Sequence, residues 1–198
     1  MLTSRLMRDQ RAYSLIEIVV VLVILGIVGA VIVGGVARSA QVDREIRARI
    51  TTFENLQIAM ERMTRDIRAA STPLVIEDPE WSLGDGMWSG IQFEVRRDGD
   101  GRCALVTYWV DDDDALRVAE QRSVDGCQTL GSETERVLVA SLTTRDVFRL
   151  EGYDNGVLEE VSDAEDADDV QLVTINLETE VVGDSAVLTS TVALRNAA

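Results

Sequence analysis

Hydrophobic side chains follow three successive patterns along the chain, and the first is an uninterrupted apolar run. Residues 18–37 contain no charged side chain. At about 1.5 Å per residue, a helix of this length spans roughly 30 Å, the hydrocarbon thickness of a bilayer. The run is too long for a typical secretory h-region, and no A-x-A cleavage site follows it. The pattern therefore predicts a membrane-spanning helix.

The second pattern is amphipathic and continues to about Ala70. Apolar side chains recur at alternating steps of three and four, which puts them on one face of an α-helix. Because residues 36–72 contain no Pro or Gly and Pro73 follows, we expect one continuous helix of more than 50 residues. Its second half should pack on a domain through Ile46, Ile50, Phe53, Leu56, Met60, Met63, Ile67 and Ala70.

The third pattern consists of short runs rich in Val, Thr and Leu, separated by turns that carry Gly or Asp. Such runs predict an antiparallel β domain. In the last run, residues such as Leu188 alternate with residues such as Thr189, as in a half-buried strand. Residues 81–90 and 159–169 are expected to be loops. The expected strands are Ile91–Arg96, Ala104–Val110, Leu116–Gln121, Val137–Leu142, Asp146–Leu150, Val170–Glu178 and Ala186–Arg195.

Charge is divided unevenly between the two ends of the chain. Arg5, Arg8 and Arg11 precede the apolar run against only Asp9, so we expect a cytoplasmic N-terminus and an exported C-terminal domain. Residues 71–198 hold 9 Arg against 28 acidic residues, a net charge of −19. A domain this acidic is a poor candidate for binding nucleic acid or an anionic membrane surface.

The sequence contains no pattern typical of catalysis. It has no His, the commonest general base and metal ligand, and no P-loop, GxGxxG or GxSxG motif. We therefore predict no enzyme, no catalytic residue, no cofactor and no metal site. Two acidic segments, Asp111 to Asp114 and residues 163–169, are interpreted as solvated turns and loops, with calcium binding as the alternative. Trp81 and Trp88 are interpreted as apolar anchors, with a sugar-stacking surface as the alternative.

Two cysteines, Cys103 and Cys127, lie in the part predicted to be exported. An even cysteine count in an oxidising compartment favours a disulfide between them. In the chain-entropy view such a bridge is worth about 3 kcal/mol. The alternative is two buried free thiols.

The start of the apolar run, RAYSLIEIVVVLVILGIVGAV, carries a further motif. A basic leader and a small residue, Ala12, precede an aromatic residue, Tyr13, and Glu17 stands just before the apolar residues. This stretch resembles the class III signal of type IV pilins and type II secretion pseudopilins, which usually have Gly and Phe at the positions of Ala12 and Tyr13. The resemblance implies that a prepilin peptidase cleaves after Ala12 and methylates the amine of Tyr13.

The resemblance also implies a fold and a function. Residues 56–71, LQIAMERMTRDIRAAS, are similar to J-class minor pseudopilins and to minor pilins of the mannose-sensitive-haemagglutinin system. The implied fold is α+β and type IV pilin-like, with a long N-terminal helix packed on an antiparallel β-sheet domain. Its expected parts are a cytoplasmic leader (1–12), a transmembrane half-helix (13–37), an amphipathic half-helix (38–72) and a periplasmic β domain (73–198).

The implied function is that of a structural minor subunit, anchored in the bacterial inner membrane, that initiates or tips a fibre. Its implied partners are other minor subunits, the major subunit and the prepilin peptidase. A signal-anchored periplasmic binding module or adhesin, with the helix as a stalk, is the alternative. Glu17 is expected to pair with the methylated amine of a neighbouring subunit, because carboxylates in hydrocarbon usually mark a function. Snorkelling of Glu17 to the cytoplasmic headgroups is the alternative.

Overall fold

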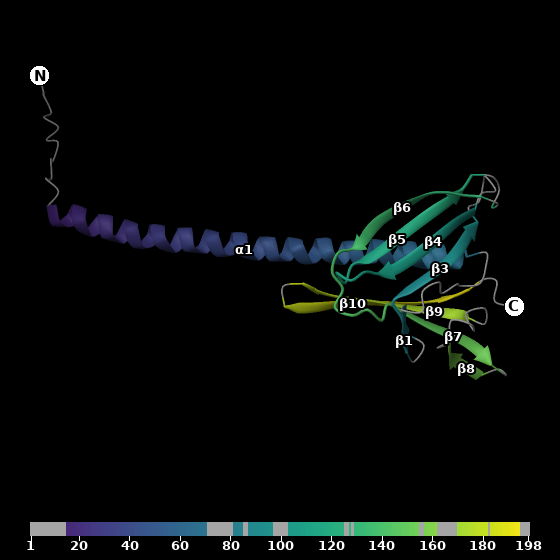
Figure 1. Cartoon of the computed structure of the whole chain (residues 1–198). Helices are drawn as coiled ribbons and strands as arrows, with labels where there is room; N and C mark the ends of the chain where they lie inside the picture. Colours follow the sequence, from purple (N-terminus) through teal and green to yellow (C-terminus); the bar gives the residue numbers. More distant parts are fainter. Residues whose placement is uncertain are drawn as a thin grey trace, which may run out of the picture. The chain divides into compact units, whose positions relative to one another are not determined.

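The computed structural model describes residues 15–70, 81–84, 87–96, 103–124, 127, 129–154, 157–161, 170–181 and 183–194. The chain divides into two compact units, residues 1–47 and residues 48–198. The described residues contain one long helix, α1, and ten strands (Figure 1). This is the expected α+β architecture, in which a long helix packs against antiparallel sheets.

Helix α1 spans Leu15–Arg68, 54 residues without interruption, which confirms the single long helix expected from the sequence. In its first half every large apolar side chain from Leu15 to Val36 is 47–81% exposed. In its last turns the buried apolar side chains are Leu56, Ala59, Met63 and Ile67. The helix therefore changes from an exposed apolar rod to an element of the domain core.

The expected apolar face of α1 is only partly correct. Ile46, Ile50 and Phe53 are 49%, 52% and 41% exposed, and Met60 is half-buried. The sheets cover the helix only from Leu56 onward, so the part of the apolar stripe before that residue lies outside the core. Spacing alone shows which residues share a stripe, but not where the domain that covers it begins.

Four strands form the first sheet, called sheet A, in the antiparallel order β3-β4-β5-β6. Two of them, β4 and β5, are joined by the Asp111–Asp114 turn. This sheet lies against the C-terminal part of α1, since side chains of β4 and β5 bond to Arg62 and Asp66 of the helix. Its strands are β3 (Gly90–Arg96), β4 (Cys103–Val110), β5 (Leu116–Ser123) and β6 (Leu130–Val139).

Six strands form the second sheet, called sheet B, in the order β1-β2-β7-β9-β10 with β8 paired to β7. All of its pairings are antiparallel. Its strands are β1 (Ser82–Gly84), β2 (Met87–Trp88), β7 (Phe148–Asp154), β8 (Val157–Glu160), β9 (Val170–Val181) and β10 (Asp184–Ala193).

The seven expected strands are all present, but several boundaries and two loop assignments were wrong. Strand β6 begins at Leu130, seven residues before the expected start. The prediction missed this part because most of its side chains are polar and exposed. Residues 81–90 contain β1, β2 and the first residue of β3, where a loop was expected. Residues 159 and 160 end β8, and residues 162–169 lie outside the described residues.

One hydrophobic core joins the end of α1 to both sheets. Trp88 lies in it with 1% of its surface exposed, and its indole Nε1 donates a hydrogen bond to the Val161 carbonyl at 3.1 Å. Trp81 packs on the edge of this core above Gly90, where a Cβ atom would come within 2.5 Å of the Trp81 ring. Both tryptophans therefore anchor the segment 81–90 on the core, and Trp88 is not accessible for stacking on a sugar.

Candidate functional site

Glu17 is the acidic residue that the sequence singles out at the edge of the apolar run. It lies in the first turn of α1 and is exposed, between the exposed apolar side chains Ile16 and Ile18. A carboxylate in the first turn is favoured by the helix dipole, which concentrates positive potential on the unpaired N–H groups there. Ala12 and Tyr13, the expected cleavage and methylation site, lie outside the described residues.

The helix that follows Glu17 is long and apolar enough to cross a membrane, and its most apolar stretch buries none of its residues within the chain. In water an exposed apolar surface of this size is strongly unfavourable. A carboxylate therefore stands at the end of a surface that suits a hydrocarbon environment.

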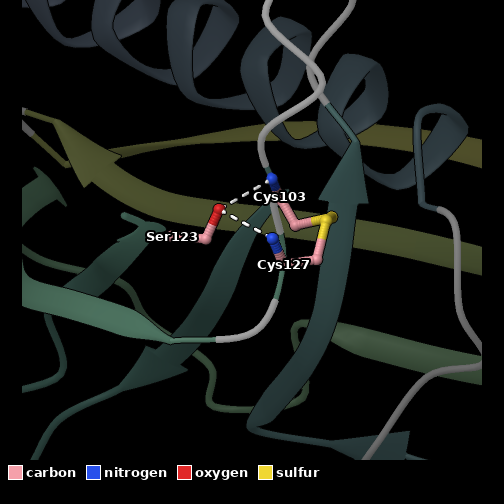
Figure 2. Close-up of a disulfide and its surroundings, with 3 residues drawn as sticks. All are labelled: Cys103, Ser123 and Cys127. Carbon is pink, nitrogen blue, oxygen red and sulfur yellow. Dashed lines mark hydrogen bonds between the residues drawn. A yellow bond between two sulfur atoms is a disulfide. The ribbon is translucent and has the colours of Figure 1, made fainter. Parts of the chain in front are cut away.

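The disulfide joins Cys103, the first residue of β4, to Cys127 in the β5–β6 connection, with the two Cα atoms 4.9 Å apart (Figure 2). Both cysteines also bond to one buried side chain. The Ser123 hydroxyl accepts hydrogen bonds from the backbone N–H of Cys103 at 3.1 Å and from that of Cys127 at 3.3 Å. The expected disulfide is confirmed, whereas no pattern in the sequence indicated the role of Ser123.

Residues 7–33 match the family described as the prokaryotic N-terminal methylation motif. This N-terminal motif is the prepilin-type cleavage and methylation motif of type IV pilins and pseudopilins. The match covers Arg8 and Arg11 of the basic leader, the expected cleavage site, Glu17 and the beginning of α1. The fold behind it is the pilin-like α+β arrangement. Pilins and pseudopilins share this motif, so it does not distinguish the two classes. No curated protein and no solved structure matches the chain.

The motif has direct consequences for the N-terminal half of α1. The motif implies processing by a prepilin peptidase and assembly into a pilus-like fibre. Together with the exposed apolar helix, it indicates anchoring in the inner membrane. Pilins, which carry this motif, are generally structural rather than enzymatic proteins.

A buried cluster of charged side chains joins α1 of this pilin-like protein to sheet A. Arg62 lies 3.4 Å from a carboxylate oxygen of Asp66, one turn further along α1, and 3.4 Å from one of Glu120 on β5. The Tyr108 hydroxyl on β4 donates a hydrogen bond to Asp66 at 2.8 Å. Arg62, Asp66 and Glu120 are each less than 10% exposed. Sequence periodicity missed this cluster, because the pattern follows apolar residues and charged residues on a helix are usually solvated.

Tyr108 stays protonated in this cluster. Burial, followed by the charge of Asp66 and the hydrogen bond to it, raises the pKa of the Tyr108 hydroxyl far above its usual value. The hydroxyl is therefore a permanent donor to Asp66. The Arg62 guanidinium lies between the two carboxylates, and Arg122 pairs with Glu120 at 2.9 Å. Because each polar group has a partner, the cluster fixes how the helix sits on sheet A.

The Asp111–Asp114 segment forms the β4–β5 turn, as expected. Asp111 accepts hydrogen bonds from the backbone N–H of Ala115 at 2.8 Å and of Asp113 at 3.0 Å, and it pairs with Arg117. These bonds, led by the one from Ala115, lower the pKa of the Asp111 carboxyl. The Asp111 carboxylate therefore uses its oxygen atoms to stabilise the turn.

Glu94 stands close to the two cysteines, with one potential ligand atom from each residue within 4.8 Å of the others. The two sulfur atoms are bonded to each other, so neither is available as a thiolate ligand. This grouping therefore does not form a metal site.

Proposed function

We propose that this chain is a minor pilin or pseudopilin that takes part in initiating or tipping a type IV pilus or a type II secretion pseudopilus. The observation that carries the proposal is the methylation motif over residues 7–33, continuous with an exposed apolar helix that has Glu17 in its first turn. A minor rather than a major subunit is supported by the similarity of residues 56–71 to J-class and mannose-sensitive-haemagglutinin minor subunits.

The N-terminus is cut after Ala12, and the new amine of Tyr13 is methylated. The leader with Arg5, Arg8 and Arg11 stays in the cytoplasm, and the β domain lies in the periplasm. A small side chain at Ala12 suits the peptidase, and the aromatic Tyr13 occupies the first mature position, as in the family motif. These steps leave an N-terminal amine four residues from Glu17.

Glu17 pairs with the methylated amine of a neighbouring subunit in the membrane. An unpaired carboxylate at this depth costs several kcal/mol, so a cationic partner is strongly favoured once two helices meet. The attraction is large only in a low-dielectric environment, and it therefore contributes during assembly and not in the isolated chain. The pair fixes the axial stagger between subunits.

The experiment is recovery of this chain with sister subunits from membranes and from isolated fibres. Wild type should co-purify with the other minor subunits, whereas Glu17→Ala should insert, be cleaved and fold but fail to join them. Glu17→Gln should be nearly as defective, because it keeps the shape of the side chain and loses the charge. Ile16→Ala is the matched control next to Glu17 and should assemble normally.

Equal recovery of partners for wild type and Glu17→Ala, with normal fibres, would contradict the pairing role. A chain that keeps its first 12 residues where a control prepilin is processed, and that is absent from fibres, would overturn the proposed function. That result would favour an anchored periplasmic binding module.

A further inference from the structure

Strand β10 forms one edge of sheet B and pairs, among the strands that the structure describes, only with β9. Its register runs through ten residue pairs, from Asp184↔Val181 to Ala193↔Leu172, without a shift. From Ser185 to Ala193 this edge contains no charged residue, no Pro and no Gly. The β9–β10 hairpin is the long yellow element in Figure 1.

A long, regular and uncharged edge is unusual, because it offers its backbone groups to any other strand. The other described edges carry the usual protection. Strand β6 contains Glu133, Glu135 and Arg136, and β8 ends with two glutamates. The outer side of β3 is partly closed by a bridge between Val95 and Ala70 at the end of α1. Strand β10 has none of these devices.

A groove of about 810 Å³ lies at the beginning of this edge, and its lining combines apolar side chains with polar ones that include Glu54 and Gln57. Ile50 and Phe53 of α1 form one side of it, and Val181 and Ala186 of the hairpin form the other. Both helix residues are about half exposed, although each belongs to the apolar stripe. An ion pair between Arg49 and Asp184 crosses the rim. The groove is thus a pocket for a large apolar side chain beside an open strand edge.

We propose that β10 accepts an extended strand from another protein of the fibre, which adds to sheet B and inserts a large apolar side chain into the groove against Phe53. This inference rests on the proposed function. In strand addition, main-chain hydrogen bonds supply affinity and pockets for alternate side chains supply specificity, and β10 with its groove offers both. The added strand would also cover the exposed Val187.

The charge of the domain selects the kind of partner. Residues 71–198 carry a net charge of −19, so a second copy of this chain would be repelled. A neutral or basic strand with one large apolar residue fits both the uncharged edge and the acidic surroundings. The occupant is therefore a different subunit and not another copy of this one.

The test uses the full chain in its own host, with a photo-cross-linking amino acid at position 187, 189 or 191. These positions alternate along β10 and are exposed. Mass spectrometry of the cross-linked peptides should identify one partner segment, with the three positions joined to residues that advance by two. That step is the signature of a paired strand, because side chains alternate with period two.

Two variants with matched controls distinguish a specific effect at the β10 edge from a general effect of adding a charge to the surface. Val187→Lys adds the residue that natural edges use against strand addition, and it should reduce cross-linking from position 191 about tenfold or more. Phe53→Glu should reduce the same cross-link to a similar extent, because it places a charge in the groove that receives the apolar side chain. Val137→Lys on the edge strand β6 and Ile58→Glu on α1 have comparable exposure outside this surface, and both should cross-link like wild type.

Several outcomes would overturn the inference. They are cross-links that advance by three or four residues on a partner helix, cross-links to a second copy of this chain, and equal loss of yield in the controls. A fibre that contains the chain but gives no cross-link from β10 also overturns it and leaves the proposed function standing. Absence of the chain from fibres, with an uncleaved N-terminus, overturns the proposed function as well.

Discussion

Charged residues in apolar surroundings have the largest individual roles in this protein. Glu17 stands beside an exposed apolar helix, and Arg62, Asp66 and Glu120 are enclosed between α1 and sheet A. The sequence identified Glu17 through its motif, because the acid interrupts an apolar pattern. It did not identify the buried cluster, because charged residues on a helix are usually solvated and the partners Tyr108 and Glu120 are distant in sequence.

Removal of Arg62 should therefore be costly. Arg62→Met removes the cation enclosed between Asp66 and Glu120, while Glu120 keeps its ion pair with Arg122 at 2.9 Å. We expect a loss of about 1.5–3 kcal/mol in the free energy of unfolding, the usual value of hydrogen bonds to charged groups. Arg65→Met is the control, since Arg65 is 70% exposed and lies 3.9 Å from Asp66. It should cost about 0–1 kcal/mol. Denaturant unfolding of the purified chain in detergent measures both, and equal losses would contradict a structural role for the cluster.

The Asp111 turn predicts a dependence on pH. The backbone N–H of Ala115 and the Arg117 guanidinium lower the pKa of Asp111 below its usual 3.8, so its contribution to stability is complete above that value. It is lost as the pH falls through the lower pKa of the folded state. Asp111→Asn should thus reduce the free energy of unfolding at pH 7, and the difference from wild type should shrink on acidification below about pH 4. A difference that does not change with pH would contradict this assignment.

At the scale of elements, the sequence predicted the long helix and the existence of seven strands, because both have clear periodicity. It failed where an element carries little apolar signal. Strand β6 is mostly polar and exposed, while β1 and β2 contain only three and two residues. It also extended the buried face of α1 too far, since burial depends on where the sheets begin and not on the helix alone.

The corrected face leads to a comparison within α1. Ile67 is fully buried, so Ile67→Ala should cost about 2–5 kcal/mol through lost burial and a residual cavity. Phe53 is 41% exposed and lines a groove, so Phe53→Ala should cost less than about 2 kcal/mol. Thermal or denaturant unfolding of the two variants under the same conditions measures both losses in the free energy of unfolding. A greater loss for Phe53→Ala would show that the groove is closed in solution.

The disulfide connects β4 to the β5–β6 connection across 24 residues of sequence. Replacing both cysteines by Ser should lower the free energy of unfolding by about 3 kcal/mol, mainly because the unfolded chain gains conformational entropy without the bridge. A thiol count on denatured wild-type protein from the periplasm is the direct check, and it should find no free thiol. Two free thiols would remove the bridge from the account.

At the scale of the whole molecule, the short N-terminal motif accounts for the apolar helix, and the α+β domain supplies the surfaces for contacts with other proteins. The motif explains why an apolar helix with an acid near its start exists, and sequence reasoning recognised it because the residue types and spacing are specific. The acidic domain supplies surfaces whose shape depends on tertiary packing. The groove beside β10 joins residues more than 120 positions apart, and no local pattern could have predicted it.

The N-terminus of the mature chain tests the central claim most directly. After co-expression with a prepilin peptidase, intact mass and N-terminal fragmentation should show a chain that begins at Tyr13 with one added methyl group. Ala12→Phe should remain full length, because a bulky side chain blocks the cut, whereas Ala12→Gly should be processed at least as well as wild type. A wild-type chain that keeps all 12 leader residues, beside a control prepilin that is cleaved, would contradict the account.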